Sequence, residues 1–561
     1  MKSTTLPKCL LWAALPAFFV YGVYRSVAFS WIGDDAFISF RYARNLVDGH
    51  GLIFNLGERV EGYTNFLWTV LIALGMRLEI DPVDFSIALG IASYAITVIV
   101  FAYLSYRQFR FEFAGARFFV PVTALILLVH RDFQVWATGG LETSWVTMLI
   151  ALGFATLVLA GRRTSFFVSG LLLVLAAMSR PDAMICYFAG AAAVLFMEKG
   201  ERRSIVYYLM PLLIIYIPYW VIRYSYYGYA FPNTYYAKSA NLTFFDQGLL
   251  YLLLYVKTYY ILLLFPVAFL AAAWVLVKDS FRKRGVRGPV HRALLAGILI
   301  VVPFTLYILK TGGDFMFARF FIPITPIIFF FLEASLHILI RSSRTRLLLA
   351  AVVFLSVVFR WDQFPSGGVQ YGIADESFYY PAEKIDDNRQ TGLQLKKYLS
   401  GTEARVAYYG AHAMFVYYSE VPLAIESDAG LTDEYIAHLP LDHRGRVGHE
   451  KKAPMQYLYE REVNFWFKTT LPTRGAWDKV RQISFGDYEA YIFIYENEVM
   501  DKLKEHDGVS FVDFPDFLDN YIGRMADLDD SRVRRDYNFF KMYYFDHNDD
   551  REREKPFVER L

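Results

Sequence analysis

Two adjacent carboxylates, Asp34 and Asp35, follow the first apolar run of the sequence. A carboxylate beside a bilayer can take a proton from a hydroxyl group or stabilise developing positive charge, and water-poor surroundings shift its pKa as that chemistry requires. Alternatively, Asp34 caps a helix over residues 36–47 by accepting hydrogen bonds from free backbone N–H groups. Because a helix cap needs one acid and not two, we take both aspartates as candidate catalytic residues.

Further polar side chains recur between the later apolar runs and form a candidate substrate-binding set. Its members are Arg41, Glu61, Asn65, Glu142, Arg180, Asp182, Asn233, Lys238, Asp314 and Arg319. Singly they have structural explanations, such as an arginine snorkelling from a helix end or an acid at a helix N-terminus. Together they combine acids with cations, which suits transfer of a group from a lipid phosphate. We expect Lys238 and Arg319 to hold the phosphate while an aspartate serves the acceptor.

The composition indicates what must position these residues. The chain has 561 residues, of which 55% are hydrophobic and only 20% charged, too few ionisable groups for an ordinary soluble surface. Long apolar runs alternate with short polar segments up to about residue 361, whereas charges, glycines and turns reach soluble density from residue 362. The sequence therefore predicts a mainly α-helical membrane domain over residues 1–361 and a soluble domain over residues 362–561.

Apolar runs of about 17–25 residues cross a bilayer as helices, because a helix satisfies its own backbone groups where no water is available. The candidate runs are 10–28, 84–106, 118–130, 143–160, 166–178, 183–196, 205–222, 249–277, 293–309, 321–340 and 347–359. Lys2 and Lys8 precede the first run and no small-residue cleavage site follows it, so an uncleaved anchor is expected. We predict a transmembrane bundle of about eleven spans.

Basic residues predict the orientation of this bundle. Lysine and arginine near span ends stay on the cytoplasmic side, and here every second loop is basic. The apolar segment 65–78 breaks the alternation if it spans, but it is shorter than the usual spanning length, so we place it in the outer interface with Trp68 as an anchor. The N-terminus then lies inside. The candidate residues and the soluble domain lie outside, on the face of the plasma membrane away from the cytoplasm.

The remaining features exclude several functions. Cys9 and Cys186 lie in or beside apolar runs and provide neither a disulfide framework nor a metal-ligand spacing, so no metal ligands are predicted. The net charge of +2, without a basic stripe, indicates no nucleic-acid partner.

The soluble segment predicts a small α/β domain. Short β-rich runs at 404–409 and 490–495 alternate with helical patterns at 391–399 and 432–438. Asp428, Arg444 and His449 complete the candidate substrate-binding set if this domain contributes to the site. The alternative is that these three residues form a buried polar network of the domain itself.

Six strings of the sequence together resemble a known family. They are DDAFISFRY at 34–42, GERVEGYTNFLW at 57–68, NTYYAK at 233–238, GGDFMFARF at 312–320, ESDAGLTD at 426–433 and RGRVGH at 444–449. In this order they resemble the AftB-type arabinofuranosyltransferases of mycobacterial cell-wall synthesis, which belong to the GT-C class of membrane glycosyltransferases.

The resemblance implies a GT-C transmembrane bundle that takes a sugar, arabinofuranose by this analogy, from a polyprenyl-phosphate donor. The acceptor would be a glycan outside the membrane, shaped or bound by the soluble domain. In GT-C enzymes an acid of the first outer loop is usually the catalytic group, which corresponds here to Asp34 or Asp35. No cofactor is required, although acids near a phosphate can recruit a divalent cation.

Three alternatives and one question of mechanism remain open at this stage. A related GT-C enzyme could use another lipid-linked sugar, such as a hexose or 4-amino-4-deoxyarabinose. A transporter or lipid flippase would need polar residues at midplane and on the inner face, and a glycan-binding receptor would leave the paired acids unexplained. Single displacement inverts the anomeric configuration. The family is understood to make a β linkage from a β donor, which instead needs an aspartate as nucleophile or oxocarbenium stabiliser.

Overall fold

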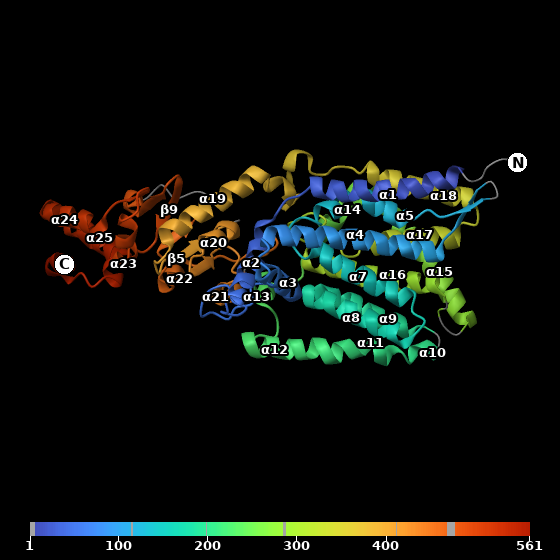
Figure 1. The fold of residues 1–561 in the computed structure, drawn as a ribbon. Helices are drawn as coiled ribbons and strands as arrows, with labels where there is room; N and C mark the ends of the chain where they lie inside the picture. Colours follow the sequence, from blue (N-terminus) through green and yellow to red (C-terminus); the bar gives the residue numbers. More distant parts are fainter. Residues whose placement is uncertain are drawn as a thin grey trace.

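The computed structural model describes residues 6–113, 116–197, 199–283, 286, 288–410, 412–441, 443–467 and 477–561. The molecule is elongated, with a helical bundle at one end and an α/β domain at the other (Figure 1). The described chain starts at the far end of the bundle, and the C-terminus lies at the far end of the α/β domain.

The bundle is built from helices that run along its length. They are α1 (Leu6–Ala28), α4 (Pro82–Gln108), α5 (Val122–Val129), α7 (Thr143–Val158), α8 (Arg163–Ser179), α9 (Met184–Leu195), α11 (Ile205–Pro211), α12 (Ile217–Tyr227), α14 (Phe245–Thr258), α15 (Phe265–Lys283), α16 (Pro289–Thr311), α17 (Thr325–Leu339) and α18 (Ser343–Val358). Short elements at the bundle ends are the hairpin of β1 (Phe111–Phe113) and β2 (Ala116–Phe118), and α10 (Lys199–Arg202).

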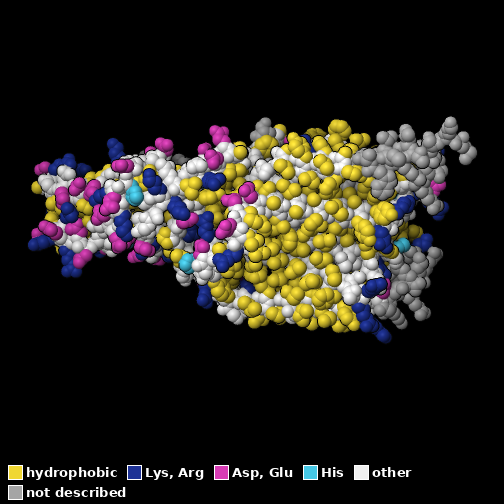
Figure 2. All heavy atoms as spheres, viewed as in Figure 1, with side chains coloured by type: hydrophobic (Ala, Val, Ile, Leu, Met, Phe, Trp, Pro, Cys, Tyr) yellow, Lys and Arg dark blue, Asp and Glu magenta, His cyan; other side chains and the backbone are white. Residues whose placement is uncertain are grey.

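The outer surface of the bundle is that of a membrane protein. Four described segments are long and apolar enough to cross a bilayer, namely Pro82–Gln108, Ile205–Tyr227, Tyr260–Lys278 and Pro289–Thr311, and five shorter apolar helices accompany them. Figure 2 shows hydrophobic side chains over the visible face of the bundle, whereas charged side chains gather on the α/β domain and at the opposite end of the bundle. The count of eleven spans and their orientation stay predictions.

Two predicted spans are interrupted helices. The run 118–130 contains only α5, after which the His130 ring accepts a hydrogen bond from the Phe133 N–H (3.2 Å) and starts α6 (Arg131–Val135). The run 249–277 is divided into α14 and α15 by a turn at Tyr260–Leu264. Pro266, the second residue of α15, has no N–H to continue the preceding helix, which accounts for the break.

The apolar segment 65–78 lies at the end of the bundle that faces the α/β domain. It forms α3 (Phe66–Arg77), which packs against α2 (Asp34–Val47) and lies near α13 (Asn233–Ala237) (Figure 1). Helix α4 begins five residues later and runs toward the opposite end. Helices α2, α3 and α13 therefore lie at one end of the bundle, and the placement of α3 outside the spans stays a prediction.

Small residues allow close packing between neighbouring helices. A side-chain carbon at Gly170 of α8 would meet the backbone carbonyl oxygen of Tyr208 in α11, and one at Gly90 of α4 would meet that of Ala137. In lipid, association of helices depends on such close contact rather than on the hydrophobic effect. These glycines therefore fix how α8 and α4 lie against their neighbours.

A strap of residues 362–381 connects the bundle to the α/β domain and lies against both. It contains the two short strands β3 (Val369–Gln370) and β4 (Ile373–Ala374). The backbone of Ala374 exchanges hydrogen bonds with Phe315 and Phe317, in the loop between α16 and α17. The strap is therefore held against the same end of the bundle as α2 and α3.

The α/β domain is organised around a mixed six-stranded sheet in the order β10-β8-β9-β7-β5-β6. Strand β5 is parallel to β6 and β7, with Val406 opposite Ala424 and Phe465, and the remaining pairs are antiparallel. The strands are β5 (Arg405–Tyr408), β6 (Leu423–Glu426), β7 (Phe465–Phe467), β8 (Gln482–Phe485), β9 (Tyr488–Ile492) and β10 (Val509–Phe511). The helices are α19 (Ala382–Leu399), α20 (Ala413–Ser419), α21 (Glu434–His438), α22 (Met455–Glu460), α23 (Asn497–Lys504), α24 (Phe514–Arg524), α25 (Asp530–Tyr543) and α26 (Arg551–Arg560).

Candidate active site

The two adjacent aspartates have different environments. Asp34 is buried, and its Oδ2 and Oδ1 accept hydrogen bonds from the backbone N–H groups of Ala413 (2.9 Å) and Met414 (2.8 Å). These groups begin α20, so Asp34 caps a helix of the α/β domain. It does not cap its own helix, whose N-cap is Gly33. Burial raises the pKa of Asp34 to about 7, although the two N–H groups oppose the rise.

Asp35 is the aspartate with an open carboxylate. It follows Asp34 on α2, about 100° further round the helix, and is only partly buried. Within the described ranges, its carboxylate makes no hydrogen bond and no ion pair. It acts electrostatically on Glu376 of the strap and on Glu426 of the α/β domain. Asp35 therefore faces the junction where the bundle, the strap and the α/β domain meet.

Glu376 is a functional candidate that the sequence analysis missed. It begins a short 3-10 turn, Glu376–Tyr379, and only 6% of the residue is exposed. Its Oε1 lies 3.7 Å from Nη2 of Arg446. Burial, reinforced by the negative charge of Asp35, raises the pKa of Glu376 to about 7 against the opposing charge of Arg446. Glu376 can therefore hold or release a proton near neutral pH beside Asp35.

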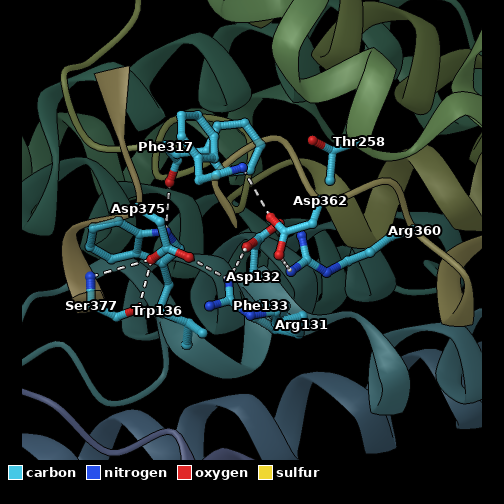
Figure 3. A network of polar contacts seen from close by, with 12 residues as sticks. Arg131, Asp132, Phe133, Trp136, Thr258, Phe317, Arg360, Asp362, Asp375 and Ser377 are labelled. Carbon is cyan, nitrogen blue, oxygen red and sulfur yellow. Dashed lines mark hydrogen bonds and ion pairs between the residues drawn. The ribbon is translucent and has the colours of Figure 1, made fainter. Parts of the chain in front are cut away.

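The network in Figure 3 holds Asp375, the residue before Glu376, against the bundle. Asp375 forms an ion pair with Arg131 at the start of α6 (2.5 Å) and accepts a hydrogen bond from the Ser377 hydroxyl (2.7 Å). Arg131 also lies 3.2 Å from Asp132, which accepts a hydrogen bond from the Tyr259 hydroxyl (2.6 Å). No sequence pattern indicated this network, because Arg131 and Asp132 only end an apolar run and Asp375 lies far along the chain.

Lys238 supplies a positive charge near Glu426. It is the C-cap of α13 and is half-buried, and its ammonium has no hydrogen-bond or ion-pair partner among the described residues. Its ammonium acts electrostatically on Glu426, as Asp35 does. Glu426 is buried and accepts a hydrogen bond from the Leu431 N–H (2.8 Å), while burial and Asp428 raise its pKa well above the usual range. The structure thus brings Lys238 and Asp35 into one electrostatic neighbourhood.

Two candidates of the α/β domain belong to the same neighbourhood. The carboxylate of Asp428 lies 3.8 Å from Nδ1 of His449, and its buried Oδ1 has no hydrogen-bond partner in the described part of the chain. The His449 ring packs edge-on against Phe315, in the loop between α16 and α17. The Arg446 guanidinium lies over the same Phe315 ring. We name this group, Asp35, Lys238, Glu376, Glu426, Asp428, Arg446 and His449, the Asp35 cluster.

A second polar group is internally paired. Glu142 lies 3.6 Å from Arg180 and 3.6 Å from Arg319, and it accepts a hydrogen bond from Asn65 (3.1 Å). Arg180 also forms a two-point ion pair with Asp182 (2.6 and 3.1 Å). Burial raises the pKa of Glu142, but Arg319 and Arg180 together outweigh it and hold the pKa below its usual value.

Arg319 is a member of this second group, not an open cation. Its Nη1 lies 3.5 Å from Asp314, in addition to its contact with Glu142. Only its Nε is buried without a hydrogen-bond partner among the described residues. The prediction that Arg319 binds the donor phosphate stays untested. Of the two predicted phosphate-binding cations, Lys238 is the one without an ion-pair partner among the described residues.

The other candidates hold the two domains or their own loops together. Arg41 donates to the carbonyl oxygens of Val421 (2.7 Å) and Phe54 (2.8 Å), linking α2 to the α/β domain. The Asn233 amide donates to the carbonyl oxygens of Leu431 (2.8 Å), Gly430 and Asp433.

Two further candidates have charged partners of their own. Glu61 pairs with Arg223 of α12 (2.5 Å), and Arg444 pairs with Glu450 (2.7 Å). Among the described residues, no group of three or more His, Cys, Asp and Glu side chains is placed to hold a metal ion.

Comparison with known proteins relates this arrangement to an enzyme class. No protein-family model matches the chain. The chain is 28% identical to a terminal beta-(1->2)-arabinofuranosyltransferase of Mycobacterium tuberculosis, over 55% of this chain and 53% of the relative. It is 29% identical to a protein of the same name from Corynebacterium glutamicum, over 52% of this chain and 46% of the relative. The resemblance to arabinofuranosyltransferases is confirmed, and the chain spans about half the length of the curated relatives it matches.

Solved structures resemble the chain more distantly. ArnT from Cupriavidus metallidurans bound to undecaprenyl phosphate has 12% sequence identity and a TM-score of 0.47, over 77% of this chain and 88% of that chain. The oligosaccharyltransferase of Archaeoglobus fulgidus tethered with an acceptor peptide has 11% identity and a TM-score of 0.43, over 73% and 63%. At these values, neither likeness bears on the function of this chain.

Proposed function

We propose that this chain is a membrane glycosyltransferase of the GT-C class that transfers arabinofuranose from a polyprenyl-phosphate donor to a glycan acceptor. The observation that carries the proposal is the Asp35 cluster. It combines an unpaired carboxylate with an unpaired ammonium at one end of an apolar bundle. The two curated relatives, both named as arabinofuranosyltransferases, support the sugar and the reaction type.

The position of the cluster suits a donor that is half lipid and half sugar. The polyprenyl chain lies among lipids beside the apolar surface of the bundle, and its phosphate reaches the polar end where Lys238 stands. An ammonium at this position stabilises the charge that collects on the phosphate as it leaves. The acceptor glycan is water-soluble and approaches from the side of the α/β domain. By the basic-loop rule, this side faces the periplasm of an inner membrane.

In this scheme, Asp35 is the general base that activates the acceptor. Its carboxylate takes the proton of an acceptor hydroxyl while the hydroxyl oxygen bonds to the anomeric carbon of the donor sugar. The bond from that carbon to the phosphate oxygen breaks, and its electron pair leaves with the polyprenyl phosphate. This single displacement inverts the anomeric configuration. Retention requires a carboxylate to bond to, or stabilise, the anomeric carbon first, and Glu376 is then available to exchange the proton.

The test is transfer by the purified full chain in detergent or nanodiscs. Labelled polyprenyl-phosphoarabinose and an arabinan oligosaccharide are the substrates, and the matched control donor is arabinose phosphate on a short, water-soluble alkyl chain. We expect labelled arabinan from the polyprenyl donor and much less from the short one. The anomeric configuration of the product, read by NMR, decides between the two displacement schemes.

A panel of donors distinguishes arabinose from other lipid-linked sugars. Polyprenyl-phosphohexose and polyprenyl-phospho-4-amino-4-deoxyarabinose are offered to the same preparation at equal concentration. Transfer of either one in preference to arabinose assigns the chain to another donor. Binding of no lipid-phosphate sugar at all overturns the proposed transferase.

A further inference from the structure

A groove of about 750 Å³ lies between the bundle and the α/β domain and shares no lining residue with the Asp35 cluster. Three separate segments line it, namely residues 58–60 of the first loop, Tyr229 after α12, and the α21–α22 region of the α/β domain. Its volume is in the range of sites that hold small molecules or segments of a polymer, about 300–1,000 Å³. None of its lining residues belongs to the chemistry described above.

The groove presents fixed aromatic faces to solvent. Tyr435 is 49% exposed and stacks on Tyr457 with ring centroids 4.3 Å apart, and Tyr229 is 36% exposed beside the His438 ring. His438 is itself stacked on Tyr236 (4.3 Å). Rings that are held by neighbours yet remain exposed provide contact area at little cost in side-chain entropy. Sugar rings, with one apolar face of C–H groups, are ligands that such platforms accept.

The polar groups of the groove form a fixed frame of acceptors. Arg461 contacts Glu58 and lies 3.0 Å from Asp433, and the Tyr457 hydroxyl donates to Asp433 (2.7 Å). The Tyr229 hydroxyl donates to Glu434. Each carboxylate accepts about four hydrogen bonds, so these carboxylates retain capacity for hydroxyl donors from a ligand.

The charge of the groove favours a neutral ligand. Three carboxylates, Glu58, Asp433 and Glu434, stand against two guanidinium groups, those of Arg59 and Arg461. A phosphate or a nucleic acid would meet net negative charge here, and a basic peptide would compete with Arg461 for Glu58 and Asp433. A ligand rich in neutral hydroxyl groups satisfies both the aromatic faces and the acceptors.

Helix α13 separates the groove from Lys238. Its first residue, Asn233, donates to carbonyl oxygens of Leu431 and Asp433 beside the groove, and Lys238 caps its other end. Five helical residues span about 7.5 Å, which is comparable to the length of one or two sugar residues. A glycan held in the groove can therefore reach toward the Asp35 cluster along the same surface.

We propose that this groove is a remote subsite that binds internal residues of a neutral acceptor glycan through Tyr229 and Tyr435. The inference rests on the proposed function for the identity of the glycan, and it adds where the acceptor is held and predicts that a long acceptor is preferred. It also gives the α/β domain a direct part in acceptor recognition, because α21 and α22 form one wall.

The experiment compares acceptor lengths on the full chain in detergent. Binding of neutral arabinan oligosaccharides of two and of eight residues is measured by saturation-transfer NMR and calorimetry. The proteins are the wild type, the double variant Tyr229→Ala/Tyr435→Ala, and the control Tyr371→Ala. Tyr371 is 61% exposed on the β3–β4 turn and lies outside the groove.

We expect the double variant to weaken binding of the long oligosaccharide about tenfold or more and to leave the short one unaffected, while Tyr371→Ala matches wild type. Transfer should show the same length dependence, as a higher KM for the long acceptor at unchanged kcat. Equal binding of the long glycan by all three proteins overturns the proposal that the groove binds a neutral glycan. Tighter binding of a phosphorylated glycan or of a basic peptide overturns it as well. Wild-type binding of the long glycan without any transfer instead overturns the proposed function and leaves the groove standing.

Discussion

Helix α2 carries two polar regions with different roles. One holds α2 against the α/β domain, and the other is available for chemistry. On one, Asp34 and Arg41 are buried, and the described structure provides partners for their polar atoms, all in the first loop or the α/β domain. On the other, Asp35 is partly exposed and lacks a direct partner within the described ranges. Saturated groups stabilise an interface, whereas an open carboxylate among like charges is available to a substrate. Adjacent residues of one type can thus have opposite roles.

The same contrast holds for the cations. Arg319 is paired with Glu142 and Asp314, whereas Lys238, on a different helix, has no direct partner in the described part of the chain. The paired group therefore positions the loop between α16 and α17, and that loop in turn carries Phe315 under Arg446 and His449. The paired group around Glu142 thus supports the Asp35 cluster.

The largest expected effect is on catalysis by Asp35→Asn. Removing a general base lowers the transfer rate by about 10²–10⁴-fold, while the fold is retained because Asp35 has no direct partner to lose. Rates of arabinose transfer are measured at saturating donor and acceptor. The matched control is Asp48→Asn, the same change at the exposed C-cap of α2, which should transfer at the wild-type rate. A comparable loss in both variants would remove Asp35 from the chemistry.

Substitution of Asp34 should act on stability. Asp34→Ala leaves two buried N–H groups of α20 without acceptors, which costs on the order of 1–3 kcal/mol of unfolding free energy. Asp34→Asn keeps one acceptor oxygen and should cost less, and Asp35→Ala should cost nothing measurable. Unfolding midpoints in detergent check this order. A destabilisation by Asp35→Ala equal to that by Asp34→Ala would contradict the assignment of roles on α2.

Lys238→Met should weaken use of the donor. Losing one charge-assisted contact to a phosphate corresponds to about a tenfold change, expressed as a higher KM for the polyprenyl donor and a smaller fall in kcat. Lys452→Met, at an exposed position of the α/β domain, provides the matched control. Steady-state kinetics with varied donor measure both. An unchanged KM in Lys238→Met would show that another cation binds the donor phosphate, and Arg319 would be the next residue to test.

The smallest effect concerns pH. The pKa of Glu376 is raised from its ordinary value to about 7, so the folded state binds this proton more tightly than the unfolded state. Its contribution to stability is full below about pH 4.5 and is lost as pH rises through about 7. Glu376→Gln should therefore flatten the fall of the unfolding midpoint between pH 5 and pH 8.

The flattening should be partial, because Asp34, whose pKa is also raised to about 7, contributes in the same direction. The measurement is a series of thermal unfolding curves across that pH range. An unaltered slope in Glu376→Gln would show that Glu376 titrates near its ordinary pKa.

The sequence predicted the apolar bundle and the α/β domain, because hydrophobic patterns and local motifs carry that information, and it named Asp35 and Lys238 as candidates whose roles stay predictions. It could not assign Asp34 to a helix that begins 379 positions later, since that contact depends on how the domains dock. Glu376 was missed for the same reason, as only the folded strap returns to the bundle. The break between α14 and α15 was within reach, because Pro266 is a visible helix breaker.

The most direct test of the central claim is to measure single-turnover transfer by Asp34→Asn and Asp35→Asn side by side, with rates normalised to folded protein. The account predicts that Asp34→Asn stays within about threefold of wild type, whereas Asp35→Asn falls by at least about a hundredfold. Asp34→Asn falling as far as Asp35→Asn, or Asp35→Asn remaining active, would contradict it.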